Sequence, residues 1–202
     1  MRKLTSETDN PISNPLKRVL KHRFESRKRR RPPCVLVVGL GNFLLRDDGV
    51  GVHAVRRFQQ LKPTQCLAIE LGTAIFNGVH LIEKADRMIA FDAVAAEGKP
   101  GSVYLLRAED ACREERHDSL HEIGLIKVLQ TLHRPPAEVV IIGVEPQIID
   151  WGMELSPAVD SAVAVMISTA QKVIADWQSH NPRFDSRYFS SFMYRRPGTV
   201  VK

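Results

Sequence analysis

Strand-like and helix-like runs alternate along the middle of this 202-residue sequence. Short apolar, β-branched runs such as 34–40 and 137–144 are typical of buried strands, whereas residues 47–61 carry apolar side chains along one helical face. Such alternation predicts an α/β fold: a three-layer α/β/α sandwich around a twisted, mostly parallel sheet of about five strands with helices on both faces. The predicted strands are 34–40, 66–71, 87–94, 101–106 and 137–144, and the predicted helices are 47–61, 74–85, 119–133 and 156–177.

Two local features refine this expectation. The step from residue 94 to residue 101 is too short for a crossover helix, so the fourth strand can be antiparallel to its neighbours. Ser156 followed by Pro157 is a typical helix start, with an N-cap residue and then proline at the first helical position.

Charge separates the ends of the chain from its middle. Residues 1–33 contain eleven Lys and Arg against three acids, and residues 178–202 contain five against one. The formal net charge of +6 therefore comes from the ends, and residues 34–177 are acidic on balance. We predict a basic, flexible N-terminal extension (1–33), an α/β domain (34–177) and a basic C-terminal tail (178–202). An acidic domain makes nucleic-acid binding improbable except through these tails.

The cysteines and the apolar runs of the sequence indicate in which compartment the protein acts and whether it enters a membrane. Cys34, Cys66 and Cys112 are odd in number and form no C-x-x-C pair, which predicts buried thiols in a reducing cytoplasm rather than disulfides. The basic run before residue 34 and the apolar run after it resemble a signal peptide. However, Gly39 and Gly41 interrupt the apolar run, no cleavage site follows, and about 20 residues are needed to span a bilayer. We therefore expect no membrane insertion.

The glycine-rich turn after the first predicted strand can serve phosphate binding or the placement of a carboxylate. A dinucleotide-binding fingerprint needs G-x-G-x-x-G, but the third position here is Leu44, and no G-K-[ST] follows for a P-loop. Phosphate binding is therefore disfavoured. The turn instead leads to Asp47 and Asp48, just past the end of the strand.

Three polar side chains are expected to meet at one edge of the sheet. Asp48 follows the first strand, Asp92 ends the third, and His121 begins the helix at 119–133. In open α/β sheets, ligands bind outside the carboxyl ends of the strands. Two carboxylates and an imidazole suit nickel, zinc, manganese or iron(II), and a three-ligand site keeps positions open for substrate or water.

Each of these residues also has a purely structural interpretation. Asp48 can cap the helix that follows it. Asp92 can pair with Arg87 or Lys99, and His121 can cap its own helix. The coincidence of all three at one predicted edge favours a functional site.

The stretch GLGNFLLRDDGVGV resembles the signature of the hydrogenase maturation endopeptidases, which process the large subunit of [NiFe] hydrogenases. In that family a strand and G-x-G-N precede a pair of acids and a G-x-G. The sequences IAFDAV and SLHEIGL resemble the family's later motifs, and GVEP and LSPAV its last strand and helix. The similarity extends from about residue 35 to residue 177, in the family's order. By this resemblance Asp48, Asp92 and His121 are metal ligands.

The resemblance implies a hydrolase that removes a C-terminal peptide from the nickel-loaded large-subunit precursor. Nickel is then the implied metal, carried by the precursor, although another divalent metal suits the ligands. The metal can polarise the scissile carbonyl, activate water or position the chain, and Asp48 or Asp47 can act as general base, as in an aspartyl protease. Neither G-x-S-x-G nor H-E-x-x-H is present, which disfavours serine and zincin chemistry.

The sequence departs from the family after the second strand. The family often has Gly-Gly-Thr and a further glycine there, whereas ELGTAIFNG has Leu71 and Ile75 in two of the glycine places. A β-branched residue stiffens a loop, so we expect a changed substrate preference. Two alternative functions remain: a non-catalytic nickel-checkpoint or assembly adaptor of the same fold, and a nucleic-acid-binding protein that uses its basic tails.

Overall fold

The computed structural model describes residues 34–108 and 120–179, without the side chains of 120–123. These residues lie in the second of two units into which the chain divides, Pro33–Lys202. Five strands form one sheet in the order β2-β1-β3-β5-β4. The strands are β1 (Val35–Leu40), β2 (Cys66–Gly72), β3 (Arg87–Ala93), β4 (Val103–Arg107) and β5 (Glu138–Val144). The N-terminal extension and most of the C-terminal tail lie outside the described residues, so their predicted boundaries stay predictions.

The sheet is parallel except at one edge. β1 pairs in parallel with β2 and β3, and β3 pairs in parallel with β5. β4 runs antiparallel to β5, as the short connection after β3 allows. The carboxyl ends of the four parallel strands therefore lie along one edge of the sheet, here called the carboxyl edge, and their beginnings lie along the amino edge. The predicted α/β sandwich is confirmed.

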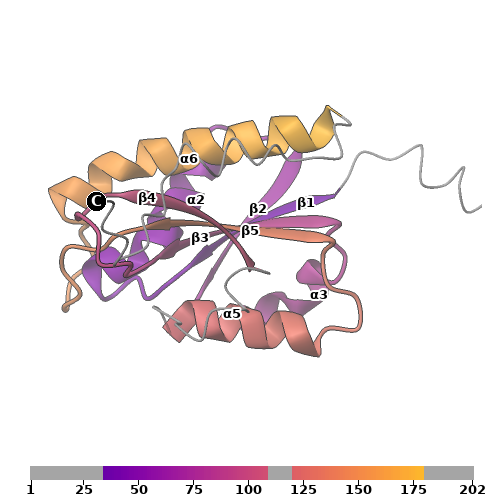
Figure 1. Ribbon diagram of the computed structural model, residues 1–202, viewed down its shortest axis with the longest axis horizontal. Coiled ribbons are helices and arrows are strands. Elements are labelled where there is room, and N and C mark those ends of the chain that lie inside the picture. The colour runs from indigo at the N-terminus through magenta and orange to yellow at the C-terminus, as the bar shows by residue number, and fades with distance from the viewer. Residues whose placement is uncertain (1–33, 109–119, 180–202) are drawn as a thin grey trace, which may run out of the picture. The chain divides into compact units, whose positions relative to one another are not determined.

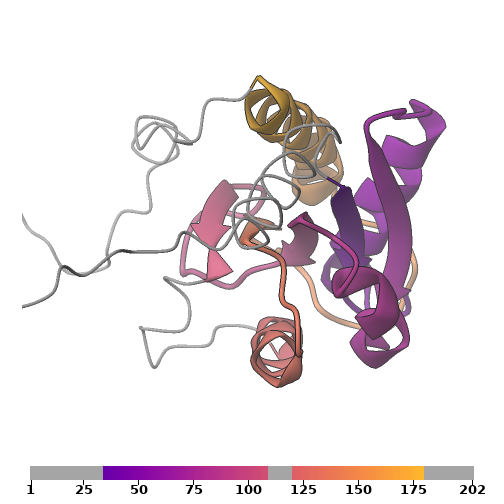
Figure 2. The same cartoon turned by 90° about the vertical axis from the view of Figure 1, so that its right-hand side faces the viewer.

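Helices cover both faces of the sheet (Figures 1 and 2). α2 (Val50–Gln60) and α6 (Pro157–Gln178) lie on one face, and α3 (Val79–Ile82) and α5 (Leu120–Thr131) lie on the other. Strand residues alternate between these faces, so that Phe91 packs with α2 and α6 whereas Ala90 packs toward α5. Two separate apolar cores result, one on each side of the sheet.

The length and apolar character of α6 are explained by the core. Among the described residues, α6 is the one helix long and apolar enough to cross a membrane. One stripe of α6 packs on the sheet, as expected for a core helix of a three-layer fold. That stripe consists of Val159, Ala162, Val163, Met166, Ala170, Val173, Ile174 and Trp177. Pro157 is the first residue of helix α6 and Ser156 is the N-cap of that helix, as predicted.

The predicted helix at 74–85 is wrong in extent. The segment forms a 3₁₀ turn, η2 (Ile75–Gly78), followed by the single turn of α3. Asn77 and Gly78 are poor helix formers, and the 3₁₀ turn is closed by a hydrogen bond from the Asn77 N–H to the Ala74 carbonyl, 2.9 Å. The helix predicted at 47–61 likewise begins as a 3₁₀ turn, η1 (Arg46–Gly49), before α2.

The amino edge is fastened by Asp86. Its carboxylate accepts the Cys34 N–H at 2.9 Å and lies 3.6 Å from the guanidinium of Arg134. Its carbonyl accepts the Ala137 N–H, 2.9 Å. The carboxylate and the carbonyl of this one residue therefore align the starts of β1, β3 and β5, the three central strands.

Candidate active site

The first aspartate of the pair, Asp47, is wholly buried and holds two loops together. Its Oδ2 accepts the N–H groups of Gln147 and Ile148, both at 2.9 Å, and its Oδ1 accepts the Ser156 N–H at 2.7 Å. The Asp47 carboxylate therefore fixes the loop after β5 and the start of α6. A carboxylate used in this way is not available to attacking water, so the suggestion that Asp47 acts as general base is wrong.

The second aspartate, Asp48, is partly exposed and lies in the glycine-rich turn. Its Oδ2 accepts the Asn42 N–H at 2.8 Å. The helix N-cap is Gly49, without a side-chain cap, so the interpretation of Asp48 as a helix cap is wrong. Gly41 has φ +102°, and a side chain there would overlap the Asp48 carbonyl. The turn thus folds onto its own backbone, and this use of its glycines differs from a phosphate cradle.

Gly51 brings the start of α2 against the carboxyl edge. A Cβ at this position would overlap the carbonyl oxygens of Leu40, at the end of β1, and Phe91, near the end of β3. Only a residue without a side chain permits this approach. Asp48 precedes Gly51 by one turn and Asp92 follows Phe91 directly, so the packing of α2 sets both acids at the ends of neighbouring strands.

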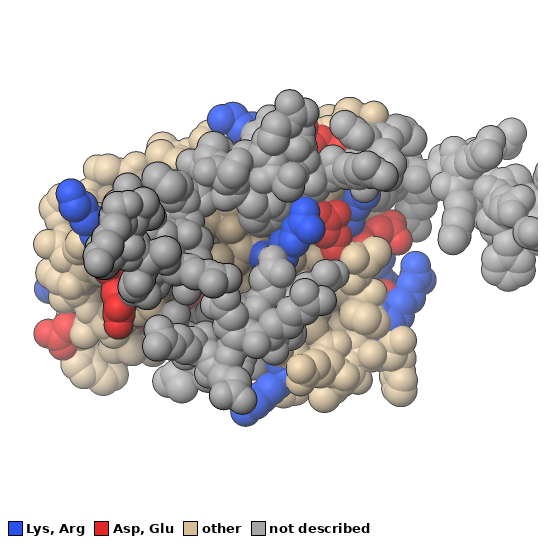
Figure 3. Space-filling model, in the orientation of Figure 1, with Lys and Arg blue, Asp and Glu red and all other residues tan. Residues whose placement is uncertain are grey.

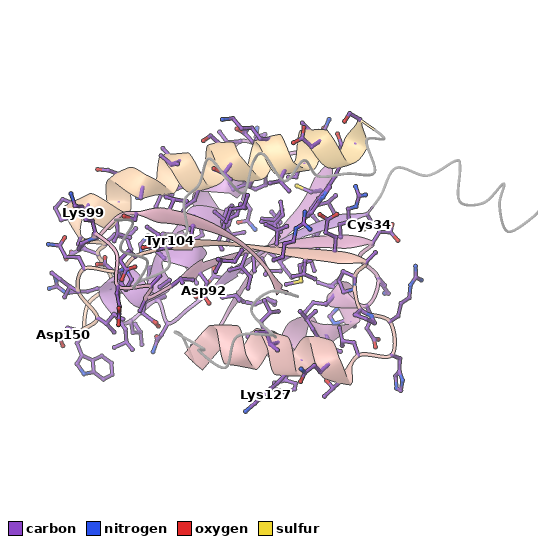
Figure 4. The ribbon with its side chains drawn as sticks, in the orientation of Figure 1. Cys34, Asp92, Lys99, Tyr104, Lys127 and Asp150 are labelled. Carbon is purple, nitrogen blue, oxygen red and sulfur yellow. The ribbon has the colours of Figure 1, made fainter. Side chains whose placement is uncertain are left out.

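Asp92 is 1% exposed at the end of β3. Phe91 and Ala93 face α2 and α6, so strand alternation directs Asp92 toward the α5 side, where Figure 4 places it. Its Oδ1 accepts the Ala93 N–H at 2.9 Å. Arg87 begins the same strand, and its guanidinium lies near Glu138, so the interpretation of Asp92 as a partner of Arg87 is wrong.

His121 is in the first turn of α5, and its side chain lies outside the described residues. α5 ends at Thr131, a few residues before β5 begins at the amino edge. Because α5 is about 18 Å long at 1.5 Å per residue, its first turn lies toward the carboxyl edge (Figure 1). The backbone of His121 is thus at the same end of the fold as Asp48 and Asp92.

The three-ligand set stays a prediction. Among the residues with described side chains, no three His, Cys, Asp or Glu form a group that could hold a metal ion, and His121 is not one of those residues. The donors themselves suit a divalent metal of intermediate hardness. A nearly buried carboxylate at a strand end and an acid fixed by a backbone N–H are the kind of side chains that a metal site needs.

The two departures from the family pattern pack against glycines. The Leu71 methyl groups lie 2.7 Å from where a Cβ on Gly78 would be, and Ile75 Cδ1 lies 3.3 Å from the corresponding position on Gly124 in α5. Ile75 is buried. Leu71 and Ile75 therefore pack the loop after β2 against the start of α3 and the first half of α5, next to the candidate site.

Sequence reasoning missed Glu145, the acid of GVEP. Glu145 is nearly buried, and its Oε2 accepts the Ala96 N–H at 2.9 Å and the Tyr104 hydroxyl at 2.7 Å. These bonds fix the loop that follows Asp92. An acid directly after a buried strand and before Pro146 was the available signal.

The pKa values of two side chains are shifted: His53, near the candidate site, and Cys66, at the opposite edge of the sheet. Burial lowers the pKa of His53, with Arg57 and Arg56 acting in the same direction against its hydrogen bond to the Met153 carbonyl. Burial raises the pKa of the Cys66 thiol to about 11. Cys66 therefore stays protonated at neutral pH. It lies at the amino edge, away from Asp48 and Asp92. Cys112 lies outside the described residues.

Known proteins with similar sequences are named as hydrogenase maturation proteases or as hydrogenase expression/formation proteins. A family model described as hydrogenase maturation protease matches residues 52–173. The hydrogenase expression/formation protein HupD of Bradyrhizobium diazoefficiens is 36% identical over 151 residues, 71% of this chain and 79% of that protein. The hydrogenase 2 maturation protease of Escherichia coli K12 is 29% identical over 136 residues, 64% of this chain and 83% of that protein.

Solved structures agree with these matches. The hydrogenase maturating endopeptidase HybD of E. coli superposes with a TM-score of 0.64 at 26% identity, covering 71% of this chain and 93% of HybD. The [NiFe] hydrogenase maturation protease HybD of Thermococcus kodakarensis gives a TM-score of 0.62 at 30% identity, covering 70% and 99%. The similarity thus extends over nearly the whole of both solved chains.

Proposed function

Because the chain belongs to the hydrogenase maturation protease family and is an endopeptidase of hydrogenase maturation, we propose that it removes a C-terminal peptide from the nickel-loaded large-subunit precursor of a [NiFe] hydrogenase. The precursor is its protein partner, and its reaction is peptide-bond hydrolysis. The reducing conditions that suit its cysteines put this step in the cytoplasm.

Asp48, Asp92 and His121 bind the nickel that the precursor carries. The observation that supports this proposal is the packing of Gly51 against the Leu40 and Phe91 carbonyls, which sets Asp48 and Asp92 at the ends of two neighbouring strands, β1 and β3. The first turn of α5 is directed to the same edge. Nickel serves here as part of the substrate, so that a precursor without it is not engaged.

Asp48 has the second role of general base. Bound nickel supplies a Lewis acid that can polarise the scissile carbonyl or lower the pKa of a water molecule. The Asn42 N–H fixes the orientation of the Asp48 carboxylate, which can accept a proton from the attacking water. Water adds to the carbonyl carbon, the C–N bond breaks, and the proton passes to the departing amine. By this role the enzyme is an aspartyl protease that depends on metal in its substrate.

The basic tails have no assigned part in this reaction. On the face drawn in Figure 3, the described Lys and Arg side chains are scattered, and some of them lie next to Asp or Glu. A nucleic-acid-binding surface instead gathers them in a patch or stripe. The described part of this face therefore shows no such patch or stripe.

The test is processing of purified precursor, followed by mass spectrometry. We expect the wild-type chain to shorten nickel-loaded precursor and to leave nickel-free precursor intact. His121→Ala and Asp92→Asn are expected to abolish cleavage, whereas Asp86→Asn, which changes an acid at the amino edge, retains it. Cleavage that survives His121→Ala would remove that ligand from the account. Normal precursor binding without cleavage under any metal would identify the adaptor function instead.

A further inference from the structure

An exposed apolar surface lies beside the candidate site, on the loops that follow β1 and β5. We call its five residues the apolar platform: Leu44, Ile148, Ile149, Trp151 and Met153. Trp151 is 75% exposed, and Ile149 and Met153 are each 56% exposed. Figure 4 places Asp150, which lies between Ile149 and Trp151 in sequence, toward the same end of the sheet as Asp92. A cluster of exposed apolar side chains on a folded protein commonly marks a surface that binds a partner.

The backbone beneath the platform is firmly held. The Gly152 N–H donates to the Leu44 carbonyl at 3.0 Å, and the Gly152 carbonyl accepts the Arg46 N–H at 2.8 Å. The Asp47 N–H donates to the Ile148 carbonyl at 3.2 Å, while the Asp47 carboxylate accepts the Ile148 N–H. The two loops are therefore joined into one surface before any partner arrives.

A second contact anchors the far end of the platform. His53 in α2 places its Nε2 2.9 Å from the Met153 carbonyl. The His53 ring also stacks on Phe43, with ring centroids 4.9 Å apart. Met153 thus projects from a backbone fixed to α2. A backbone that is already fixed loses little further conformational entropy when a partner covers its side chains, which favours binding.

The platform is continuous with the acids of the site. Leu44 is four residues before Asp48, and Asp47 bonds directly to the backbone of Ile148. A molecule that lies on the platform must therefore approach Asp48 at the carboxyl edge. A second copy of this chain would cover that edge and exclude substrate. α6 has 22 residues and therefore ends about 33 Å from its start, toward the amino edge and away from the platform.

We propose that the apolar platform docks the hydrogenase large-subunit precursor through an apolar surface segment next to its nickel site. This inference rests on the proposed function and extends it to substrate recognition. Trp151 is the central anchor, since exposed tryptophan on a rigid loop is the residue type that most often dominates interface energy. The platform determines how tightly the precursor binds, whereas the acids carry out the cleavage.

The first test separates precursor binding from cleavage. Trp151→Ser is expected to raise the KM for nickel-loaded precursor at least tenfold. The difference in cleavage rate between this variant and the wild type should become smaller when the precursor is saturating. Ile149→Ser should act in the same direction with a smaller effect. The matched control is Leu61→Ser, which removes an equally exposed apolar side chain, 56%, at the end of α2 near the amino edge. It should leave KM unchanged.

The second test observes Trp151 directly. The chain has two tryptophans, and Trp177 is buried at 4% exposure in the core. In Trp177→Phe, the fluorescence of Trp151 should be emitted at long wavelength and be readily quenched by acrylamide. Addition of nickel-loaded precursor should shift the emission to shorter wavelength and protect it, after subtraction of a matched sample carrying Trp151→Phe as well.

The outcomes are distinguishable. A wild-type chain that cleaves precursor, with Trp151→Ser and Ile149→Ser both indistinguishable from it in KM, overturns the docking inference and leaves the proposed function intact. A wild-type chain that neither binds nor cleaves precursor overturns the proposed function. Protection of Trp151 in the absence of precursor also overturns the inference: if protein concentration controls it, the occupant is a second copy, and if deletion of residues 180–202 abolishes it, the occupant is the tail.

Discussion

The amino and carboxyl edges of the sheet both carry acidic side chains, but they use them differently. At the amino edge, Asp86 and Glu138 lie near the guanidinium groups of Arg134 and Arg87, at 3.6 and 3.7 Å. Such partly exposed ion pairs contribute little to stability, about 1 kcal/mol or less. They align the starts of the strands and leave the chemistry of the acids unused.

At the carboxyl edge, backbone N–H groups orient the acids. Asp47 accepts three of them, and Asp48 and Asp92 each accept one. Since these N–H groups belong to the end of β3 and to loops that the fold holds in place, the acids are oriented before substrate binds. The two neighbouring acids therefore differ: Asp47 holds two loops together, whereas Asp48 is the partly exposed acid for which we propose a role in cleavage.

Replacement of Asp47 is expected to give the largest loss of stability. Asp47→Ala leaves three buried N–H groups without their acceptor, which should lower the free energy of unfolding by about 3–5 kcal/mol. Asp86→Ala at the amino edge removes one accepted N–H bond and one partly exposed ion pair, which should lower the free energy of unfolding by about 1–2 kcal/mol. Urea denaturation of both variants measures the difference. Equal losses would mean that the two edges are held in the same way.

Asp48→Asn should separate chemistry from stability. The amide keeps an oxygen for the Asn42 N–H, so the free energy of unfolding should change by less than about 1 kcal/mol. Loss of a general base and metal ligand should slow precursor cleavage by about 10²–10⁴-fold. Single-turnover kinetics and denaturation of the same preparation give both values. If the free energy of unfolding fell as far as in Asp47→Ala, Asp48 would serve, like Asp47, to hold the fold together.

Gly51→Ala probes the approach of α2 to the carboxyl edge. The added methyl group meets the Phe91 and Leu40 carbonyls, and such overpacking should cost about 1–3 kcal/mol of unfolding free energy. Gly124→Ala is the control, because its methyl group meets only the movable end of Ile75 and alanine favours a helix by about 1 kcal/mol. Thermal unfolding compares them. A neutral Gly51→Ala would contradict the close packing of α2 on the ends of β1 and β3.

His53 should give the smallest effect, a pH dependence of stability. Its pKa is lower in the folded protein than in the unfolded chain, so the unfolded chain binds protons more readily. Stability should therefore fall as pH decreases from about 7 through the unfolded value of about 6.5. Urea midpoints at several pH values should show this slope in the wild type and a shallower one in His53→Gln. An unchanged slope would assign it to other groups.

The fold was predictable because its elements are strongly patterned. The five strands were found within two residues, since buried β-branched runs flanked by turns leave few alternatives. The helix predicted at 74–85 was too long because apolar spacing continues through Asn77 and Gly78, where the backbone turns. Periodicity records which side chains are buried but not whether the backbone between them is helical.

The site was predictable only in part. The positions of Asp48 and Asp92 follow from strand order, but the difference between Asp47 and Asp48 does not. Asp47 is bound by residues about 100 positions away, and such contacts leave no local pattern. The apolar platform was missed for the same reason, because exposure of Trp151 depends on how distant loops pair.

The central claim is that Asp48, Asp92 and His121 bind one nickel ion. Its most direct test is a crystal structure of the chain with Ni²⁺, with diffraction recorded at the nickel absorption edge. The account predicts one anomalous peak with an oxygen of each aspartate and a nitrogen of His121 at about 2.0–2.2 Å, the range of comparable metal sites. A peak that lacks any one of these three ligands, or that lies at the amino edge, would contradict it.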